Sequence, residues 1–506
     1  MAIFKVETVA LSGLLGNLVE VEVFISDGLP AFILLGLPDA ALSESKERVR
    51  SALVNSGFPW LNKKLTVSLS PAWLPKSGSA FDLAIAVAIT GAQGEIAQDK
   101  VLYTVFLGEL ALDGSVRGVN GILPSVLAAK QSGVQRAIVP IENYAEASIV
   151  EGIEIVPVLV FKDVLDFLNL GIKKTPELIN ANAKNNFLDM GEIVGQKIAK
   201  NLIEISAIGA HNSLLIGPPG TGKTMLAERL PTILPELNSD EAIEVAAVHS
   251  ISGTNAKLEF ISRIPPFVSP HHTATIASIV GGGSTIIRPG AASLAHNGVL
   301  FIDEAPECNR GVLDALRQPL ESGEITISRA VGNITFPARF QLILAANPCP
   351  CGKYSGRGRS CICPQLSIRK YLQKISGPLL DRIDIRALVE TPSRVELASN
   401  NSSETSSVIR ERVITARQKA QERFQNESWK LNSQIPSSAL RSRYKARREA
   451  MTLLHNEIEA ERLSARGFHR VLRVAWSYAD SRGHEIPELV DVESAFAARS
   501  GFEIGL

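Results

Sequence analysis

The residues best suited to do chemistry form a phosphate-binding loop. The run Gly-Pro-Pro-Gly-Thr-Gly-Lys-Thr matches the pattern G-x-x-x-x-G-K-[ST] at every fixed position. Small residues let the backbone curl until successive N–H groups point at an anion. The lysine of such a loop reaches the β- and γ-phosphates, and the final hydroxyl holds Mg²⁺. The residues predicted to bind a nucleoside triphosphate are Gly217, Pro218, Pro219, Gly220, Thr221, Gly222, Lys223 and Thr224.

The sequence around this P-loop favours a ligand site over a glycine-rich turn that binds nothing. The apolar run 213–216 predicts a buried strand before the loop, and residues 225–230 predict a helix after it. The N-terminus of that helix points its positive end at the phosphate. A strand and a helix must therefore hold the loop between them.

A second group of candidate residues follows another apolar run. Residues 299–302 predict a strand that ends in Asp303 and Glu304. In this Walker B pattern the first acid holds Mg²⁺ through water, and the second orients the attacking water. Such acids also follow strands by chance, but far less often downstream of a complete P-loop. A third strand, 340–346, ends at Asn347, which we expect to hold the water from the opposite side.

Phosphoryl transfer also requires positive charge at the γ-phosphate. Residues 376–384 resemble the finger segment of magnesium-chelatase-type ATPases, which implies that Arg382 serves the nucleotide of a neighbouring subunit. Residues 464–470 resemble the sensor 2 pattern of the AAA+ lid, which implies that role for Arg470, with Arg466 in reserve. A surface ion pair is the alternative for each arginine.

Three further residues resemble an AAA+ segment that lies against adenine. They are Val194, Gly195 and Gln196, and they open a helical pattern that leads into the P-loop. Helix capping alone is the other interpretation.

Four of the five cysteines form two C-x-C pairs, Cys349 with Cys351 and Cys361 with Cys363. Four thiols so arranged suit a tetrahedral Zn²⁺ site that closes a loop. Thiols that merely pack, and iron–sulfur ligation, are the alternatives. We expect Cys308 to be buried beside the Walker B acids.

The first part of the chain predicts an α+β or α/β domain. Residues 19–25 and 64–70 alternate in polarity as strands do, 41–53 has helical spacing, and 81–89 predicts a buried helix. Residues 71–83, with 108–110 and 120–122 after them, resemble the segments of Lon-protease-like domains in which a Ser–Lys dyad lies. The resemblance therefore implies a Lon-like fold for this domain.

The dyad itself is missing from this resemblance. Its two positions fall on Ala80 and Leu123, and Ser79 lies one residue away from the nucleophile position. The resemblance therefore implies a scaffold or a nucleic-acid-binding platform instead of a peptidase. Lys76 and Asp82 could pair, but we expect both at the solvated surface.

The interval between the P-loop and the Walker B acids leaves room for extra elements, and its sequence has the loop chemistry of an inserted excursion. Within it, the adjacent His271 and His272 are expected to be structural or solvated. Residues 324–336 predict a hairpin, at a place where the AAA+ branch of MCM helicases and magnesium chelatases carries a pore-lining hairpin. Arg329 near its tip and Arg288 in the insert are the DNA-contact candidates, and ordinary surface arginines are the alternative.

Domain boundaries follow from these patterns. We predict a Lon-like domain at 1–170, a linker at 171–190, an AAA+ domain at 191–392 and a helical lid at 400–506. One predicted lid helix places apolar residues on one face and leaves four basic residues outside, namely Arg410, Arg412, Arg417 and Lys419.

Composition excludes a global attraction to nucleic acid or membrane. The 52 basic residues balance 52 acidic ones, so binding to either must be local. Apolar runs fall far short of the ~18 residues of a membrane span, and no basic leader precedes an apolar core. These features predict a cytoplasmic protein.

Together, the motifs resemble the ComM/YifB family of bacteria. That resemblance implies a homo-hexamer that uses ATP and Mg²⁺ and drives branch migration on single-stranded and branched DNA, with recombinase machinery, during natural transformation. Two rivals stay open: a magnesium-chelatase motor subunit, and a protein remodeller that acts on peptide.

Overall fold

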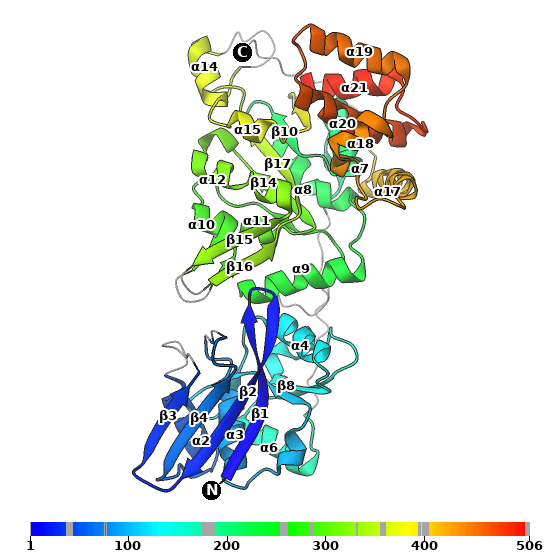
Figure 1. Cartoon of the computed structure of the whole chain (residues 1–506). Coiled ribbons are helices and arrows are strands. Elements are labelled where there is room, and N and C mark those ends of the chain that lie inside the picture. The colour runs from blue at the N-terminus through cyan, green and yellow to red at the C-terminus, as the bar shows by residue number, and fades with distance from the viewer. Residues whose placement is uncertain are drawn as a thin grey trace.

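The computed structural model describes residues 2–36, 44–74, 76, 78–174, 188–253, 262–283, 287–329, 332–354, 361–392, 396 and 404–500. Figure 1 shows three regions: an N-terminal part (2–174) at one end, a central part (188–392) that carries the P-loop, and C-terminal helices (404–500) beside the central part. The architecture is mixed α/β.

The N-terminal part contains a seven-stranded sheet in the order β3-β4-β2-β1-β5-β8-β9. Its strands are β1 (Ala2–Ser12), β2 (Leu15–Ser26), β3 (Ala31–Leu35), β4 (Lys64–Ser70), β5 (Thr104–Phe106), β8 (Arg136–Pro140) and β9 (Glu154–Val158). The short strands β6 (Glu109–Leu110) and β7 (Val116–Arg117) pair separately. Its helices are α2 (Ser45–Asn55), α3 (Asp82–Ala92), α4 (Ile122–Gln131), α5 (Tyr144–Ala147) and α6 (Phe161–Leu170).

The local predictions for this part are confirmed. The predicted strands 19–25 and 64–70 lie in β2 and β4, which pair antiparallel and alternate between buried and partly exposed residues. The predicted buried helix is α3, and each of its residues is buried. Residues 45–53 of the predicted 41–53 helix lie in α2, whereas 41–43 lie outside the described residues.

The prediction that Lys76 and Asp82 lie at the solvated surface is wrong. Both side chains are buried, and Asp82 pairs with Arg48 of α2, whose Nε lies 2.7 Å from Oδ2. Burial raises the pKa of Asp82 to about 6, although Arg48 opposes this shift. The Lys76 ammonium donates to the carbonyl of Pro71. Burial is tolerated because each charged group finds a polar partner.

Neither Leu123, at the lysine position of the absent dyad, nor the nearby Ser79 forms a nucleophile arrangement. Leu123 is fully buried in α4. The Ser79 hydroxyl donates to the Glu109 carboxylate, so its hydrogen bond goes to an acid on β6.

The central part is built on a parallel sheet in the order β11-β14-β17-β10-β18. The strands are β11 (Phe267–Val268), β14 (Gly298–Ile302), β17 (Phe340–Ala346), β10 (Ser213–Ile216) and β18 (Ile385–Leu388). One face packs on α7 (Lys197–Gly209), α8 (Lys223–Ile233) and the C-terminal helices. The strands predicted at 213–216, 299–302 and 340–346 are confirmed as β10, β14 and β17.

The interval between α8 and β14 contains extra elements, as its length predicts. Helix α9 (Ser239–Ser252) begins at a capping box in which Asn238 and Glu241 exchange side-chain hydrogen bonds with the backbone. The other elements on this side of the sheet are α10 (Ile276–Val280), β12 (Gly281–Gly282), β13 (Arg288–Pro289), α11 (Ala291–Leu294), α12 (Arg310–Ala315) and α13 (Pro319–Ser322). The predicted hairpin is confirmed as β15 (Glu324–Arg329) and β16 (Gly332–Pro337).

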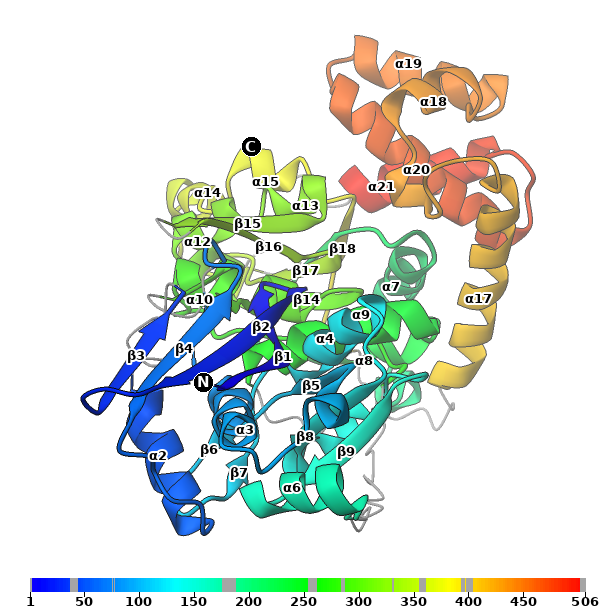
Figure 2. The same cartoon turned by 60° about the horizontal axis from the view of Figure 1, so that its bottom comes forward.

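The chain continues through α14 (Gln365–Leu372) and α15 (Gly377–Leu380) to the C-terminal helices. These are α17 (Ser406–Arg423), α18 (Ser437–Ser442), α19 (Arg448–Glu459), α20 (Ala465–Arg482) and α21 (Leu489–Ser500), and Figure 2 shows α17 running along the side of the central part. The prediction that Arg410 and Arg417 lie outside is wrong. Their guanidinium groups donate to the carbonyls of Thr232 and Ala207 and so fasten α17 to α8 and α7.

The N-terminal and central parts meet along α9 and the β15–β16 hairpin. Helix α4 lies against α9 (Figure 2), and the Gly121 N–H donates to the Ser250 carbonyl at 3.0 Å. The tip of the β1–β2 hairpin also reaches the central part (Figure 1): a Cβ on Gly13 would lie 2.9 Å from Cγ2 of Ile334 in β16. The β15–β16 hairpin of the central part is therefore in contact with the N-terminal part.

A close approach between α3 and β1 gives a stability prediction. A Cβ on Gly91 would lie 2.3 Å from Cε1 of the buried Phe4 ring. Helix propensity alone would make Gly91→Ala stabilising by about 1 kcal/mol, but overpacking costs about 1–3 kcal/mol. We expect a lower urea midpoint for Gly91→Ala and partial recovery in Gly91→Ala with Phe4→Leu. A raised midpoint for Gly91→Ala would contradict the close packing.

Candidate nucleotide site and basic pocket

The P-loop lies between β10 and α8, where β10 is flanked by β17 and β18. Gly220 and Gly222 have φ of +76° and +88°, which a residue with a Cβ rarely adopts. A Cβ on Gly217 would lie 2.2 Å from the Val389 carbonyl oxygen. The loop thus needs glycine at 220 and 222 for its backbone conformation and at 217 for its close packing against the chain after β18.

Lys223 has its ammonium at the mouth of this loop. Its Nζ donates to the carbonyls of Gly217 and Pro218 at 2.7 and 2.9 Å and to Asn347 Oδ1 at 3.2 Å. Burial lowers the pKa of Lys223, and the nearby Asp303 and Glu304 carboxylates oppose that shift. The Lys223 ammonium is therefore hydrogen-bonded to Asn347, the residue that follows β17.

The Walker B acids follow β14 at the same edge of the sheet. Asp303 Oδ2 accepts a 2.9 Å hydrogen bond from the Thr224 hydroxyl, so the two groups expected around Mg²⁺ lie together. Glu304 has φ of +48° and donates its N–H to Asp303 Oδ1 at 2.8 Å. This turn directs the two acids differently, and the Glu304 side chain is about half exposed.

His272 is a site residue that the sequence did not reveal. Its Nδ1 lies 3.4 Å from Glu304 Oε2, in the segment that follows β11. The His271 ring stacks near it, with ring centroids 4.1 Å apart. The prediction of a merely structural or solvated pair misses this contact, because no spacing rule connects residue 272 to residue 304. This contact becomes predictable only once β11 is known to pair with β14.

The Val194–Gln196 step reaches the P-loop through one of its members. Gln196 has φ of +54°, and its amide Nε2 donates to the Thr221 carbonyl. Val194 is 40% exposed, which leaves an apolar side chain open to solvent. Gly195 packs against the side chain of Glu396.

The predicted arginines gather in a separate basic pocket of about 260 Å³. Its described lining consists of Glu321, Asp381, Arg382, Ser437, Arg466, His469, Arg470 and Arg473. Arg382 pairs with Glu321, and Arg466 Nη1 lies 3.2 Å from Asp381 Oδ2. Among these described lining residues there is no P-loop or Walker B residue, so the structure brings Arg382 and Arg470 together but not to their own P-loop.

Arg470 is anchored by a buried network. Its Nη1 lies 2.7 Å from Asp384 Oδ1, while the other oxygen of Asp384 lies 3.0 Å from His211 Nδ1. The opposite ring nitrogen of His211 lies 2.8 Å from Ser477 Oγ on α20. Burial raises the pKa of Asp384, but Arg470 and His211 outweigh it and hold the pKa well below its usual range. The network joins the central sheet to α20.

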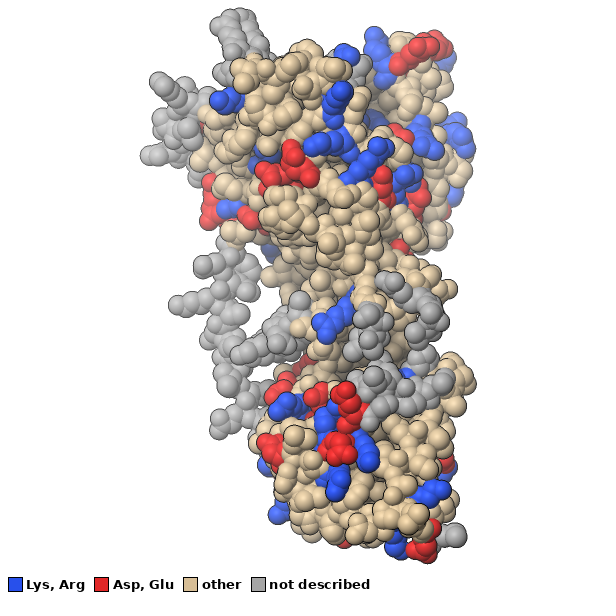
Figure 3. Space-filling model, turned by 90° about the vertical axis from the view of Figure 1, so that its left-hand side faces the viewer, with Lys and Arg blue, Asp and Glu red and all other residues tan. Residues whose placement is uncertain are grey.

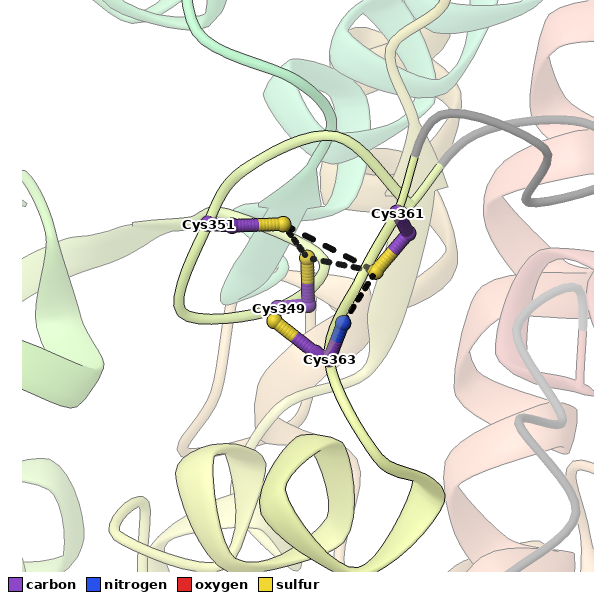
Figure 4. A group of neighbouring side chains, drawn as sticks. All are labelled: Cys349, Cys351, Cys361 and Cys363. Carbon is purple, nitrogen blue, oxygen red and sulfur yellow. Dashed lines mark hydrogen bonds between the residues drawn. The ribbon is translucent and has the colours of Figure 1, made fainter.

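The four paired cysteines converge after β17, as Figure 4 shows. Their Sγ atoms all lie within 4.8 Å of one another. This donor set is compatible with a zinc ion. Cys308 is buried elsewhere, with its Sγ 4.0 Å from the Asp303 carbonyl oxygen, as predicted.

The two DNA-contact candidates lie on different elements, one in the insert and one in the hairpin. Arg288 is exposed on β13, in a small ladder with β12. Arg329 ends β15, but its side chain lies outside the described residues.

Family models match three stretches of the chain. The model described as magnesium chelatase, subunit ChlI, matches residues 189–397; subunit ChlI of Mg-chelatase matches 21–143; and the ChlI C-terminal model matches 403–499. The parallel sheet, its P-loop and these matches define an AAA+ ATPase of the magnesium-chelatase type.

Proteins that are similar over almost the whole length of the chain make the family assignment more specific. The chain is 43% identical over 496 residues to competence protein ComM of Haemophilus influenzae, covering 96% of this chain and 95% of the relative. It is 40% identical over 503 residues to YifB of Escherichia coli (99% and 97%), and 44% over 501 residues to a Mycobacterium tuberculosis protein (99% and 99%). The chain belongs to the ComM/YifB family.

Within the described part of the chain, the structure contains no helix that is sufficiently long and apolar to cross a lipid bilayer.

The Asp384 network gives a second stability prediction. Asp384→Ala leaves Arg470 and His211 without their buried partner, which should cost about 3–5 kcal/mol of unfolding free energy. Asp381→Ala, which breaks the exposed pair with Arg466 and removes a charge near Arg386, should cost less than Asp384→Ala. Chemical denaturation of both variants measures the difference, and equal losses would refute the role of the network.

The same carboxylate adds a pH dependence. Because the folded-state pKa of Asp384 is depressed, its stabilisation is present above its ordinary value of 3.8 and is lost as pH falls below that value. Asp384→Asn should therefore lose less stability than the unmodified protein as the pH falls from about 5 to about 2. Urea denaturation of both proteins across this range measures the difference, and parallel losses would contradict the depressed pKa.

Proposed function

We propose that this chain is the subunit of an ATP-driven ring, a homo-hexamer, that moves on branched DNA and drives branch migration during natural transformation. ATP with Mg²⁺ is the proposed ligand of the P-loop, and the four cysteines are the proposed ligands of a structural zinc. The N-terminal part is proposed to be a Lon-like scaffold, the C-terminal helices the AAA+ lid, and the cytoplasm the location.

The basic pocket carries the ring proposal. Arg382 and Arg470 face a cavity without contacting their own P-loop residues, and the pocket lies at the surface with Arg466 80% exposed. A phosphate group that entered this pocket would have to displace Glu321 from Arg382, and a triphosphate carries enough negative charge to do so. The neighbouring subunit's nucleotide is the proposed occupant, with Arg382 as the finger and Arg470 beside it.

Within one subunit, the proposed roles follow from the site geometry. Lys223 binds the β- and γ-phosphates, Thr224 and Asp303 hold Mg²⁺, and Glu304 orients the attacking water with Asn347 on the opposite side. The contacts between Thr224 and Asp303 and between Lys223 and Asn347 support this arrangement. Val194, Gly195 and Gln196 are proposed to lie against the base.

The DNA proposal rests on the family and on the hairpin. A relative bears the name competence protein ComM, and β15–β16 is supported by the N-terminal part. Figure 3 shows basic side chains interspersed with acidic ones on the face it displays, without a single basic field. DNA contacts are therefore proposed to be local, at Arg329 and Arg288 in the channel of the ring.

Mixed rings test the finger. Arg382→Ala and Lys223→Ala should each lower ATP hydrolysis by about 10³-fold or more. In mixed assemblies, an intact P-loop from Arg382→Ala meets an intact Arg382 from Lys223→Ala, so part of the activity should return. Arg117→Ala, on the exposed face of β7, serves as the control. Mixtures that stay inactive despite co-assembly would contradict a shared site.

Substrate choice tests the motor. Hydrolysis should rise with three-stranded DNA junctions, and junction resolution should require ATP and an intact Lys223. ATP hydrolysis is also measured with unfolded protein and with porphyrin-pathway partners. These test the two rival functions, a protein remodeller and a magnesium-chelatase motor subunit. Stimulation by either of these, with indifference to DNA, would overturn the branch-migration proposal and leave the ATPase assignment in place.

A further inference from the structure

The spacing of the cysteine sulfurs is that of a metal site. The Sγ atoms of Cys349, Cys351 and Cys361 are separated by 3.4, 3.6 and 3.7 Å. Zinc–sulfur bonds of ~2.3 Å in a tetrahedron place neighbouring sulfurs about 3.8 Å apart. A disulfide would need about 2.05 Å. Cys363 completes the group within 4.8 Å. The polypeptide therefore holds three thiols at the spacing of a zinc site and a fourth within 4.8 Å of them.

The donor type agrees with this size. Thiolates are soft ligands that select zinc over the hard cations Mg²⁺ and Ca²⁺. An iron–sulfur cluster inserts several iron and sulfide ions between its cysteines and so needs sulfurs farther apart than these. The four thiols come from two segments on either side of residues 355–360, so one ion would join the chain after β17 to the chain before α14.

The position of this cluster connects it to the nucleotide site. Cys349 is fully buried and stands two residues after Asn347, which accepts from Lys223. The turn that carries the first cysteine pair closes with the Gly352 N–H donating to the Cys349 carbonyl at 3.0 Å. A Cβ on Gly352 would lie 2.7 Å from Cδ of Pro219 in the P-loop. The turn thus packs directly on the loop, with no room for a side chain.

We propose that one Zn²⁺ held by Cys349, Cys351, Cys361 and Cys363 braces the P-loop, so that the affinity for nucleotide depends on a metal that never contacts the nucleotide. The ion fixes the 349–352 turn, and the turn fixes Pro219 on one side and Asn347 on the other. Without the ion, the thiols have no common partner and the turn loses its support. This inference rests on the proposed nucleotide site, but it does not require DNA or ring motion.

Metal removal is the first test. Zinc content of the full-length protein is measured by atomic spectrometry, and affinity is measured with a fluorescent ADP analogue. We expect one zinc per chain, a loss of affinity of about tenfold or more when the zinc is stripped under reducing conditions, and recovery with Zn²⁺ but not with added Mg²⁺. Absence of zinc from protein produced with sufficient zinc would overturn the site, and unchanged affinity after stripping would overturn the brace.

Two substitutions separate metal binding from bracing. Cys361→Ser should lose zinc and affinity together. Gly352→Ala keeps all four ligands but pushes a methyl group into Pro219, so zinc should stay while affinity falls about tenfold. Gly171→Ala is the matched control, because Gly171 has φ of +72° against +74° for Gly352, and a Cβ on Gly171 would meet nothing within 4 Å. Equal affinities in Gly352→Ala and Gly171→Ala would refute the contact.

These outcomes also distinguish this inference from the proposed function. If the protein binds no nucleotide even when fully loaded with zinc, the nucleotide site itself fails. If it binds nucleotide with the same affinity with and without zinc, only the brace fails.

Discussion

The nucleotide site depends on the parallel alignment of β10, β14 and β17. The carboxyl ends of parallel strands meet at one edge of a sheet, and here those ends carry the P-loop, the Walker B acids and Asn347. Residues more than a hundred positions apart in the chain consequently come within hydrogen-bond distance, as Lys223 and Asn347 do. Because neighbouring strands fix one another's register, the site is set by the sheet before any ligand binds.

The same alignment does not bring the predicted arginines to the P-loop of their own chain. The acids and the ammonium lie at the strand ends, whereas Arg382 and Arg470 face their own pocket across the junction of β18 and α20. The buried Asp384 carboxylate pairs with both Arg470 and His211 and so holds Arg470 in the pocket. Breaking these buried pairs would cost free energy of unfolding. In the ring that we propose, this pocket of one subunit and the open phosphate loop of the next subunit would form one site.

Much of this arrangement could be predicted from the sequence, because strong local patterns agree with the tertiary structure. The strands β10, β14 and β17 and the wholly buried α3 follow from continuous apolar runs, and the P-loop follows from its glycines. The pairing of Thr224 with Asp303 also follows once both motifs are assigned. The roles assigned to these residues remain predictions.

The rest depends on contacts between distant segments, which local patterns do not encode. His272 meets Glu304 only because β11 lies beside β14. Asp82 is buried because Arg48 reaches it from another helix, and Arg417 is drawn in by a carbonyl of α7. In each case the sequence pattern places a polar or charged residue at the surface because its partner is remote in the chain.

The central claim is that a triphosphate bound by one subunit is completed by an arginine from the next. A structure of the assembled protein with a non-hydrolysable ATP analogue measures this directly, through the distance between the Arg382 guanidinium and the γ-phosphate. The account predicts that Arg382 leaves Glu321 and lies within hydrogen-bond distance of the γ-phosphate on the neighbouring subunit. An Arg382 that still pairs with Glu321 in the nucleotide-loaded ring, or that contacts the nucleotide of its own chain, would contradict it.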